Sequence, residues 1–262
     1  MDYGLIGGKL GHSYSKEIHE ALADYSYELC PLTEEEFAPF MENHDFRAIN
    51  VTIPYKQKVI PYLAGMDAGA EAIGAVNTIV NRDGKLYGYN TDYMGFDYML
   101  KKHEVDLNGK KVLIIGNGGA AQAVKACARD AGAGQLVIVR RSRDGESVTY
   151  EELMDSHTDC EVIINTSPVG MYPDVDVSPL DLTPFRNCSA VLDLIYNPLT
   201  TVLVAQAGKL GMLGVTGLEM LVAQAKYAVE YFLDTRIDDE RIDEIYQKMV
   251  KEKRGIESEV MR

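Results

Sequence analysis

One segment near the middle of the chain constrains the fold more than any other. It begins with the unbroken apolar run Val112 to Ile115, which is typical of a strand buried in the centre of a parallel sheet. A glycine-rich turn follows directly, and then an alanine-rich stretch in which apolar residues recur at helical spacing. A second apolar run, Leu136 to Val139, completes a strand–helix–strand unit. This order predicts an α/β fold built on a parallel sheet.

The glycine-rich turn has the pattern G-x-G-x-x-A and lies between the buried strand and the helix. That context is the one required of a dinucleotide-binding fingerprint. Small residues let the backbone approach a diphosphate, and the N-terminus of the helix favours its negative charge. We therefore predict that Gly116, Asn117, Gly118, Gly119 and Ala120 bind a dinucleotide. The alternative is a tight strand-to-helix turn that binds no ligand.

The end of the second strand indicates which dinucleotide is bound. Proteins that bind NAD usually place Asp or Glu there to accept a hydrogen bond from the ribose 2′-hydroxyl. This chain instead has Arg140 and Arg141, with a third arginine shortly after and no acid before Asp144. Guanidinium groups suit a 2′-phosphate dianion, so we predict NADP. The alternative is a solvated basic turn whose arginines pair with Asp144 and Glu146.

Composition excludes several other classes of function. The chain has 262 residues, 40 acidic and 26 basic, and its net charge of −14 disfavours a nucleic-acid partner. No apolar run approaches the roughly 20 residues that cross a bilayer, and we expect neither a secretory signal nor a membrane partner. The cysteines, Cys30, Cys127, Cys160 and Cys188, are scattered and form no CxxC pair. This spacing favours reduced thiols in the cytoplasm and predicts no metal site.

The opening third of the chain reads strand–helix–strand–helix–strand. Residues 3–7 and 15–22 predict a strand and a helix, and residues 33–41 predict a second helix with a Thr33–Glu36 capping box. Residues 74–92 read as a hairpin joined at Arg82, Asp83 and Gly84, and a helix follows from Asp92 to Lys102. From Gly217 the pattern changes to long helices.

Hydride transfer to a ketone leaves an alkoxide, so a proton donor should lie beside the carbonyl. The chain has 5 histidines, none with an obvious carboxylate partner, and Lys56 is the better candidate. Pro54 suits the first position of a short helix, which would place Lys56 in its first turn beside the positive end of the helix dipole. Asp92 is the predicted partner. The alternatives are a surface lysine and an Asp that only caps a helix.

Polar side chains elsewhere in the first third suit a small polar substrate. Asn77 can donate and accept hydrogen bonds to a hydroxyl group. Ser13 and Ser15 lie between the first strand and its helix, where hydroxyls and backbone N–H groups can bind a carboxylate. The alternative for Ser15 is a plain helix N-cap.

Together these motifs resemble those of the shikimate dehydrogenase family, in the same order and through nearly the whole chain. GHSYS at 11–15 resembles the family's substrate loop, and NVTIPYK at 50–56 resembles its catalytic segment. GAVNT at 74–78, NTD at 90–92 and GNGGA at 116–120 resemble the next three motifs. RRS at 140–142 resembles the NADP-selecting turn, and DLIYNPLTT at 193–201 and GLEMLVAQA at 217–225 resemble the closing motifs.

The resemblance implies a two-domain α/β enzyme. A discontinuous substrate-binding catalytic domain would comprise residues 1–98 and 217–262, and a Rossmann-type NADP-binding domain would comprise residues 99–216, with the active site in the cleft. It also implies reversible NADPH-dependent reduction of 3-dehydroshikimate to shikimate, a step in the biosynthesis of chorismate and the aromatic amino acids. We expect a cytoplasmic monomer or homodimer.

The resemblance further assigns roles to individual residues. Ser13 and Ser15 would hold the substrate carboxylate, and Lys56 and Asp92 would form the acid–base pair. The rest of the substrate shell would be Thr52, Asn77, Tyr196 and Gln224. The cofactor would contact the glycine turn, the arginine turn and two further positions, which adds Ser142, Leu194 and Gly217 to the residues named above.

Three positions differ from the family pattern, and two alternative functions stay open. Lys16 stands where the substrate loop usually has proline, Arg140 where the cofactor turn usually has asparagine, and Gly145 where a later basic residue is usual. One alternative is an NAD-preferring quinate/shikimate dehydrogenase. The other is a non-catalytic NADP-binding sensor of the same fold.

Overall fold

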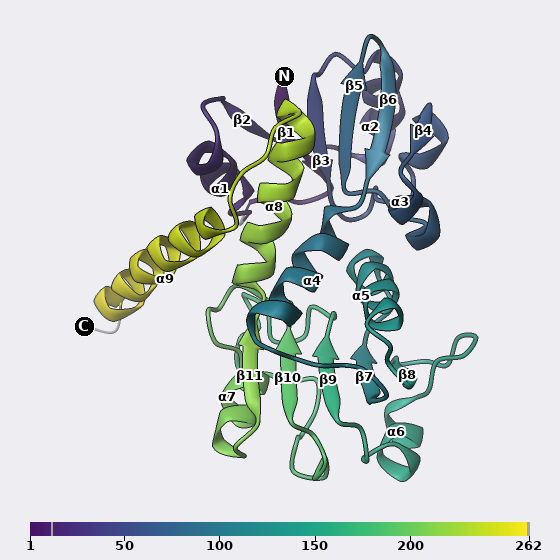
Figure 1. Ribbon diagram of the computed structural model, residues 1–262, viewed down its shortest axis with the longest axis vertical. Coiled ribbons are helices and arrows are strands. Elements are labelled where there is room, and N and C mark those ends of the chain that lie inside the picture. The colour runs from purple at the N-terminus through teal and green to yellow at the C-terminus, as the bar shows by residue number, and fades with distance from the viewer. Residues whose placement is uncertain (12, 261–262) are drawn as a thin grey trace. The chain divides into compact units, whose positions relative to one another are not determined.

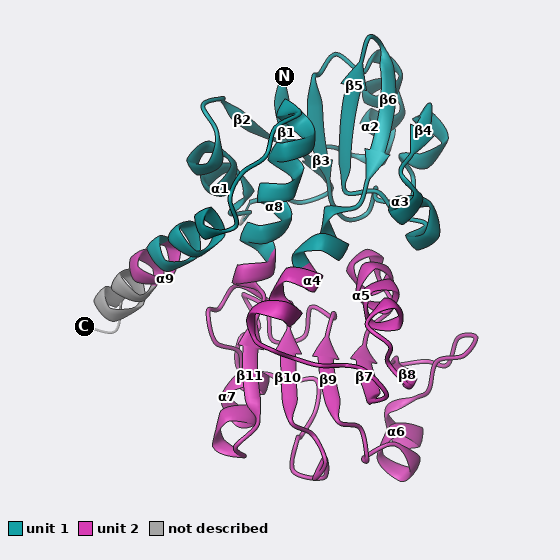
Figure 2. Ribbon diagram, in the orientation of Figure 1, with its two compact units in different colours: residues 1–95, 221–248 teal, residues 96–220, 249–262 magenta. Residues whose placement is uncertain are grey.

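The computed structural model describes residues 1–11 and 13–260, with side chains described as far as residue 253. It divides into two compact units (Figure 2). The first comprises Met1–Gly95 and Leu221–Lys248. The second comprises Phe96–Met220 and the last turns of the C-terminal helix from Met249.

The first unit contains a six-stranded sheet with the strand order β2-β1-β3-β5-β6-β4 (Figure 1). Its strands are β1 (Tyr3–Gly7), β2 (Tyr27–Pro31), β3 (Ala48–Val51), β4 (Gly65–Met66), β5 (Thr78–Arg82) and β6 (Lys85–Tyr89). Its helices are α1 (Ser15–Leu22), α2 (Glu34–Asn43), the 3-10 helix η1 (Ile60–Tyr62), α3 (Ala68–Ile73), the start of α4 (Thr91–Lys102), most of α8 (Leu218–Leu233) and the start of α9 (Glu240–Val260). β1 pairs in parallel with β2 and β3, whereas β5 is antiparallel to β3 and β6.

Side chains that alternate along the strands build a core on each face of this sheet. On one face Leu5 packs in a cluster with Ala228 and Phe232 of α8. On the other face Ile6 packs in a cluster with Phe37 of α2. The Thr33–Glu36 capping box at the start of α2 is present as predicted. The predicted hairpin is confirmed as β5 and β6, joined at residues 83 and 84.

The second unit contains a five-stranded sheet, entirely parallel, with the strand order β11-β10-β9-β7-β8. Its strands are β7 (Lys111–Ile115), β8 (Gln135–Val139), β9 (Val162–Asn165), β10 (Ala190–Asp193) and β11 (Leu213–Thr216). Its own helices are α5 (Gly119–Asp130), α6 (Tyr150–Ser156) and α7 (Val202–Lys209). The strand–helix–strand unit β7–α5–β8 is therefore confirmed, and with it the α/β fold class.

The cysteines are all free, and three of them are buried in the second unit. Burial raises the pKa of the Cys127 thiol to about 12 and those of Cys160 and Cys188 to about 11. Cys30, in β2, is only half-buried. These thiols are packing residues of the two cores.

The short helix predicted at Pro54 and Lys56 is wrong. Residues 53–59 form consecutive turns, and the only helical segment nearby in the described chain is η1. The physical reason is Tyr55, whose buried ring anchors the segment and whose hydroxyl donates to Leu32 O at 2.7 Å. The dipole argument for Lys56 therefore does not apply.

Several short elements had no sequence prediction, among them β4, α3, α6 and β11. Each has at most seven residues, which is too short for periodicity to identify. Within residues 1–11 and 13–260, no helix combines the length and the apolar character needed to cross a membrane.

Candidate active site

Lys56 and Asp92 lie together in the first unit. Lys56 Nζ is 2.5 Å from Asp92 Oδ2, and the two side chains are only 12 % and 11 % exposed. Lys56 comes from the turns that follow β3, and Asp92 is the second residue of α4. Asp92 does not cap that helix, because Asn90 Oδ1 accepts the hydrogen bond from Tyr93 N. The carboxylate is thus free to hold the ammonium group.

The Asn77 amide contacts the other oxygen of this carboxylate and links it to Gln224. Asn77 Nδ2 donates to Asp92 Oδ1 at 3.0 Å and lies 3.4 Å from Gln224 Oε1. Gln224, in α8, donates its own amide hydrogen to Leu221 O at 2.9 Å. Four predicted site residues, Lys56, Asn77, Asp92 and Gln224, therefore meet in one cluster. They come from segments up to 168 positions apart in the chain.

Three further predicted residues follow the first and third strands of the same sheet. Ser13 Oγ donates to Ser15 Oγ at 3.1 Å and accepts from Ser15 N at 3.2 Å. Ser15 is the first residue of α1 and does not cap it, because the N-cap position is Tyr14. Thr52 comes directly after β3, and its N–H donates to Ile6 O at 2.9 Å. All three follow the carboxyl ends of parallel strands, where α/β proteins bind ligands.

The residues that sequence reasoning missed are buried polar groups behind this cluster. Asn50 is 5 % exposed, and Thr78 and Thr91 are fully buried. Thr91 N donates to Asn77 Oδ1 at 2.7 Å. The one available signal was the presence of Asn50 in the otherwise apolar strand sequence AINV.

The glycine turn fits a diphosphate. Gly116 has a φ of +99°, and a Cβ there would lie 2.9 Å from Thr166 Oγ1. α5 begins at Gly119 with no side-chain cap, so the first N–H groups of the helix have no capping side chain. Lys125 reaches back along the helix, and its Nζ donates to Asn117 Oδ1 at 2.8 Å. Burial lowers the pKa of Lys125, and sequence reasoning did not single out this cation.

The arginine turn is exposed at the end of β8. Arg140 pairs with Asp144, and Arg143 Nη1 pairs with Glu152 Oε1 at 3.0 Å. Arg141 and Ser142 are exposed, and among the described residues Arg141 has no acidic partner. The alternative prediction, in which the arginines pair with Asp144 and Glu146, therefore holds for Arg140. Arg141 remains available to bind an anion.

The last predicted residues follow β10 and β11 in the second unit. A Cβ at Gly217 would lie 2.1 Å from the carbonyl oxygen of Leu194, so only glycine allows this approach of the two segments. Tyr196, two residues beyond Leu194, is half-buried. Ser13, Ser15, Thr52, Lys56, Asn77, Asp92 and Gln224 therefore belong to the first unit, whereas Tyr196 and all the predicted cofactor residues belong to the second.

Asp193, at the end of β10, is a buried acid beside these positions. It accepts hydrogen bonds from Asn165 Nδ2 at 3.0 Å, Ile195 N at 3.1 Å and Thr201 Oγ1 at 2.7 Å. Burial nevertheless raises the pKa of Asp193 to about 6. The folded protein therefore binds this proton more tightly than the unfolded chain, whose Asp pKa is about 3.9.

This raised pKa predicts how stability depends on pH. The protonated Asp193 carboxyl adds to the free energy of unfolding. This stabilisation is fully present below about pH 4, is lost as the pH rises to about 6, and stays lost above that. Over this range the wild type should lose on the order of 2 kcal/mol of unfolding free energy relative to Asp193→Asn, which has no carboxyl proton to lose. Urea unfolding of both proteins across the range measures the difference. Parallel plots of unfolding free energy against pH for the two proteins would contradict the raised pKa of Asp193.

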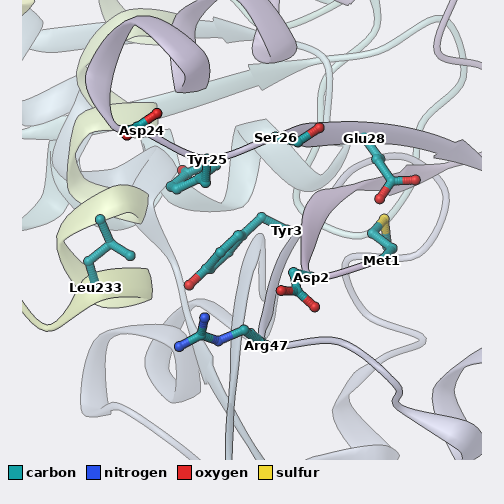
Figure 3. Close-up of a pocket in the computed structure, with 9 residues that line it drawn as sticks. All are labelled: Met1, Asp2, Tyr3, Asp24, Tyr25, Ser26, Glu28, Arg47 and Leu233. Carbon is teal, nitrogen blue, oxygen red and sulfur yellow. The ribbon is translucent and has the colours of Figure 1, made fainter.

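A separate pocket of about 680 Å³ lies in the first unit at the amino end of β1 (Figure 3). Tyr3 stacks on Tyr25 there with 4.3 Å between ring centroids, and the Arg47 guanidinium lies 5.6 Å from the Tyr3 ring centre. Ser13 and Ser15 follow the opposite end of the same strand. None of the predicted site residues lines this pocket. Within the described residues, no group of three or more His, Cys, Asp or Glu side chains could hold a metal ion.

Comparison with known proteins adds the family. Residues 5–79 match the family model of the shikimate dehydrogenase substrate binding domain. A shikimate dehydrogenase (NADP(+)) from Clostridium beijerinckii is 38 % identical, over 93 % of this chain and 96 % of its own.

Solved structures agree with that match. Shikimate dehydrogenase 1 from Peptoclostridium difficile superposes with a TM-score of 0.89 at 36 % identity, covering 97 % of this chain and 99 % of that one. Shikimate 5-dehydrogenase from Thermus thermophilus, in complex with NADP(H) and shikimate, superposes with a TM-score of 0.84 at 27 % identity, covering 95 % and 99 %. The resemblance predicted from the motifs is confirmed, and this chain belongs to the shikimate dehydrogenase family.

Proposed function

We propose that this chain is an NADP-dependent oxidoreductase that interconverts shikimate and 3-dehydroshikimate, on the route to chorismate and the aromatic amino acids. Family membership supports the substrate and the cofactor. The observation that carries the chemistry is the Lys56–Asp92 pair, 2.5 Å apart and largely buried, with the amides of Asn77 and Gln224 beside it.

The chain's own residues handle the proton and the orientation. When bound, NADPH would supply the hydride in reduction, and NADP⁺ would accept it in oxidation. Lys56 gives a proton to the reacting oxygen during reduction and takes it back during oxidation. Asp92 holds the ammonium group at that oxygen. Ser13 and Ser15 hold the substrate carboxylate, and Thr52, Asn77, Tyr196 and Gln224 fix its hydroxyl groups and ring.

For the cofactor, we propose that Gly116, Asn117, Gly118, Gly119 and Ala120 hold the diphosphate. Arg140, Arg141 and Ser142 hold the 2′-phosphate, and Leu194 and Gly217 lie against the nicotinamide. The uncapped start of α5, the close approach at Gly116 and the unpaired Arg141 support this assignment.

For the domains, we propose that residues 1–98 with 217–262 bind the substrate and that residues 99–216 bind NADP. The division into two compact units supports two domains, with bounds that differ from the proposed ones: the first unit comprises Met1–Gly95 and Leu221–Lys248, and the second comprises Phe96–Met220 and the residues from Met249. We further propose a cytoplasmic monomer or homodimer, and the absence of any disulfide among the four thiols supports that location.

The test is an absorbance assay at the reduced-nicotinamide band, with shikimate or quinate as substrate and NADP or NAD as cofactor. We expect the highest kcat/KM for shikimate with NADP. Failure to reduce either cofactor with shikimate would contradict the proposed activity. A higher kcat/KM with NAD would contradict the proposed cofactor alone.

A further inference from the structure

A chain of buried side chains continues from Asp92 into the sheet of the first unit, away from Lys56. Its members are Tyr27, Asn50, Thr78 and Asn77, from β2, β3, β5 and the residue before β5. Tyr27 and Thr78 are fully buried, and Asn50 is 5 % exposed. The mechanism above uses only Asn77. The other three are polar groups in an apolar core, where a polar group is costly unless it is hydrogen-bonded.

In the hydrogen bonds that connect these side chains, each member donates to the next one on the way to Asp92. Tyr27 has a single hydroxyl proton, and it donates to Asn50 Oδ1 at 2.7 Å. Burial raises the pKa of Tyr27 well above its usual value, so the phenol keeps this proton. With its oxygen engaged, Asn50 must turn its Nδ2 the other way, where it donates to Thr78 Oγ1 at 3.1 Å and to Asn77 O at 3.2 Å.

Thr78 orients the side-chain amide of Asn77 through a hydrogen bond. Thr78 Oγ1 accepts from Asn50 and donates its own proton to Asn77 Oδ1 at 3.0 Å. Thr91 N donates to the same Oδ1 at 2.7 Å, and Thr91 Oγ1 donates to it at 3.2 Å. With these donors on its oxygen, Asn77 turns its Nδ2 to Asp92 Oδ1 at 3.0 Å. A flipped Asn77 amide would set its N–H groups against Thr91 N and its oxygen against the carboxylate.

We propose that Thr78, oriented by Tyr27 through Asn50, is a positioning residue for the proton-transfer step. It fixes the Asn77 amide, which in turn holds the Asp92 carboxylate that Lys56 contacts at 2.5 Å. This inference rests on the proposed function. It adds Thr78 and Tyr27, neither of which touches Lys56 or Asp92 in any of the hydrogen bonds described above.

The primary test compares Thr78→Val with Thr78→Ser. Valine keeps the shape of threonine but can neither accept from Asn50 nor donate to Asn77, whereas serine keeps the hydroxyl. The readout is the single-turnover rate of NADPH oxidation at saturating 3-dehydroshikimate, which excludes product release. We expect a roughly tenfold loss for Thr78→Val and recovery to within about twofold for Thr78→Ser. The Kd for NADP should stay unchanged in both.

Measuring Thr78→Val in the Lys56→Ala protein separates a positioning effect from general damage to the fold. In the Lys56→Ala protein the proton donor is already missing, so the orientation of Asp92 no longer matters. Adding Thr78→Val there should change the residual rate by less than about twofold. A purely structural effect of Thr78→Val would lower the residual rate of Lys56→Ala by the same roughly tenfold factor.

Tyr27 has a closely matched control in the same unit. Tyr27→Phe should lower the single-turnover rate about threefold, and it should have little added effect on Thr78→Val because both act through one chain. The Tyr25 hydroxyl likewise bonds one side chain, His19 Nδ1, at 2.8 Å. Tyr25→Phe therefore loses a bond of similar length that is not connected to Asn77, and we expect its rate to stay within about twofold of wild type.

The outcomes are distinguishable. A full rate for Thr78→Val, an equal loss for Thr78→Ser, or an undiminished effect of Thr78→Val in the Lys56→Ala background would each overturn the positioning role. If Lys56→Ala itself keeps the wild-type rate, the proposed mechanism fails first. If Thr78→Val does not fold, Tyr27→Phe against Tyr25→Phe decides, and equal rates for those two proteins would overturn the proposal.

Discussion

Replacing Lys56 by alanine is expected to lower the turnover of shikimate with NADP by about 100-fold or more, which is the range for loss of a general acid–base group. Lys56 Nζ is the cation in contact with Asp92, and its removal leaves no proton carrier at that position. The Kd for NADP should stay within about twofold, because the predicted cofactor residues belong to the other unit. Steady-state kinetics and a fluorescence titration with NADPH measure the two quantities.

Lys58 provides the control for this substitution. It is two residues away, 44 % exposed, and paired with Glu34 Oε2 at 2.5 Å on the surface. Exposed ion pairs contribute little, so Lys58→Ala should leave both turnover and stability close to wild type. Turnover of Lys56→Ala within a factor of about two of wild type would remove Lys56 from the mechanism.

Removing the two arginines after β8 is expected to raise the KM for NADP by roughly 100-fold while changing the KM for NAD by less than about threefold. The double variant Arg140→Ala/Arg141→Ala takes away two donors of charge-assisted hydrogen bonds to a 2′-phosphate. Only NADP has that group, so the two cofactors serve as each other's reference. The exposed pair between Arg140 and Asp144 is a weak competitor for the phosphate.

The matched control is Arg129→Ala/Arg186→Ala. Both arginines are exposed in the second unit, and their removal changes the net charge by the same amount. If long-range attraction for an anion were the cause, the control would raise the KM for NADP as much as the test variant does. Retention of NADP preference by Arg140→Ala/Arg141→Ala would contradict the assignment of this turn.

The β7–α5–β8 unit of the second sheet could be predicted closely because β7 is buried on both faces. Val112 to Ile115 is an unbroken apolar run for that reason, and the glycine turn after it leaves few alternatives. Polar or turn residues at fixed offsets were equally informative in the first unit. The Thr33–Glu36 capping box identified the start of α2, and the turn at Asp83 and Gly84 identified the hairpin.

The local structure around Lys56 could not be predicted, because tertiary contacts decide it. Pro54 suits a helix start, but the burial of Tyr55 and its bond to Leu32 hold the segment in turns. The predicted contact between Lys56 and Asp92 is nevertheless present, because Asp92 follows the hairpin at the start of α4 as expected. The chain through Asn50 and Thr78 was missed because periodicity identifies apolar faces and does not show which buried polar groups meet.

The burial of three cysteines makes the rate of thiol labelling a measure of local opening. Thiol reagents attack the thiolate, so a buried thiol with a raised pKa reacts only when the structure around it opens. The reaction rates of Cys127, Cys160 and Cys188 therefore measure the opening of the second unit, whereas the half-buried Cys30 can react without opening. Labelling in the presence and absence of NADP would then reveal whether the cofactor protects the second unit from transient unfolding.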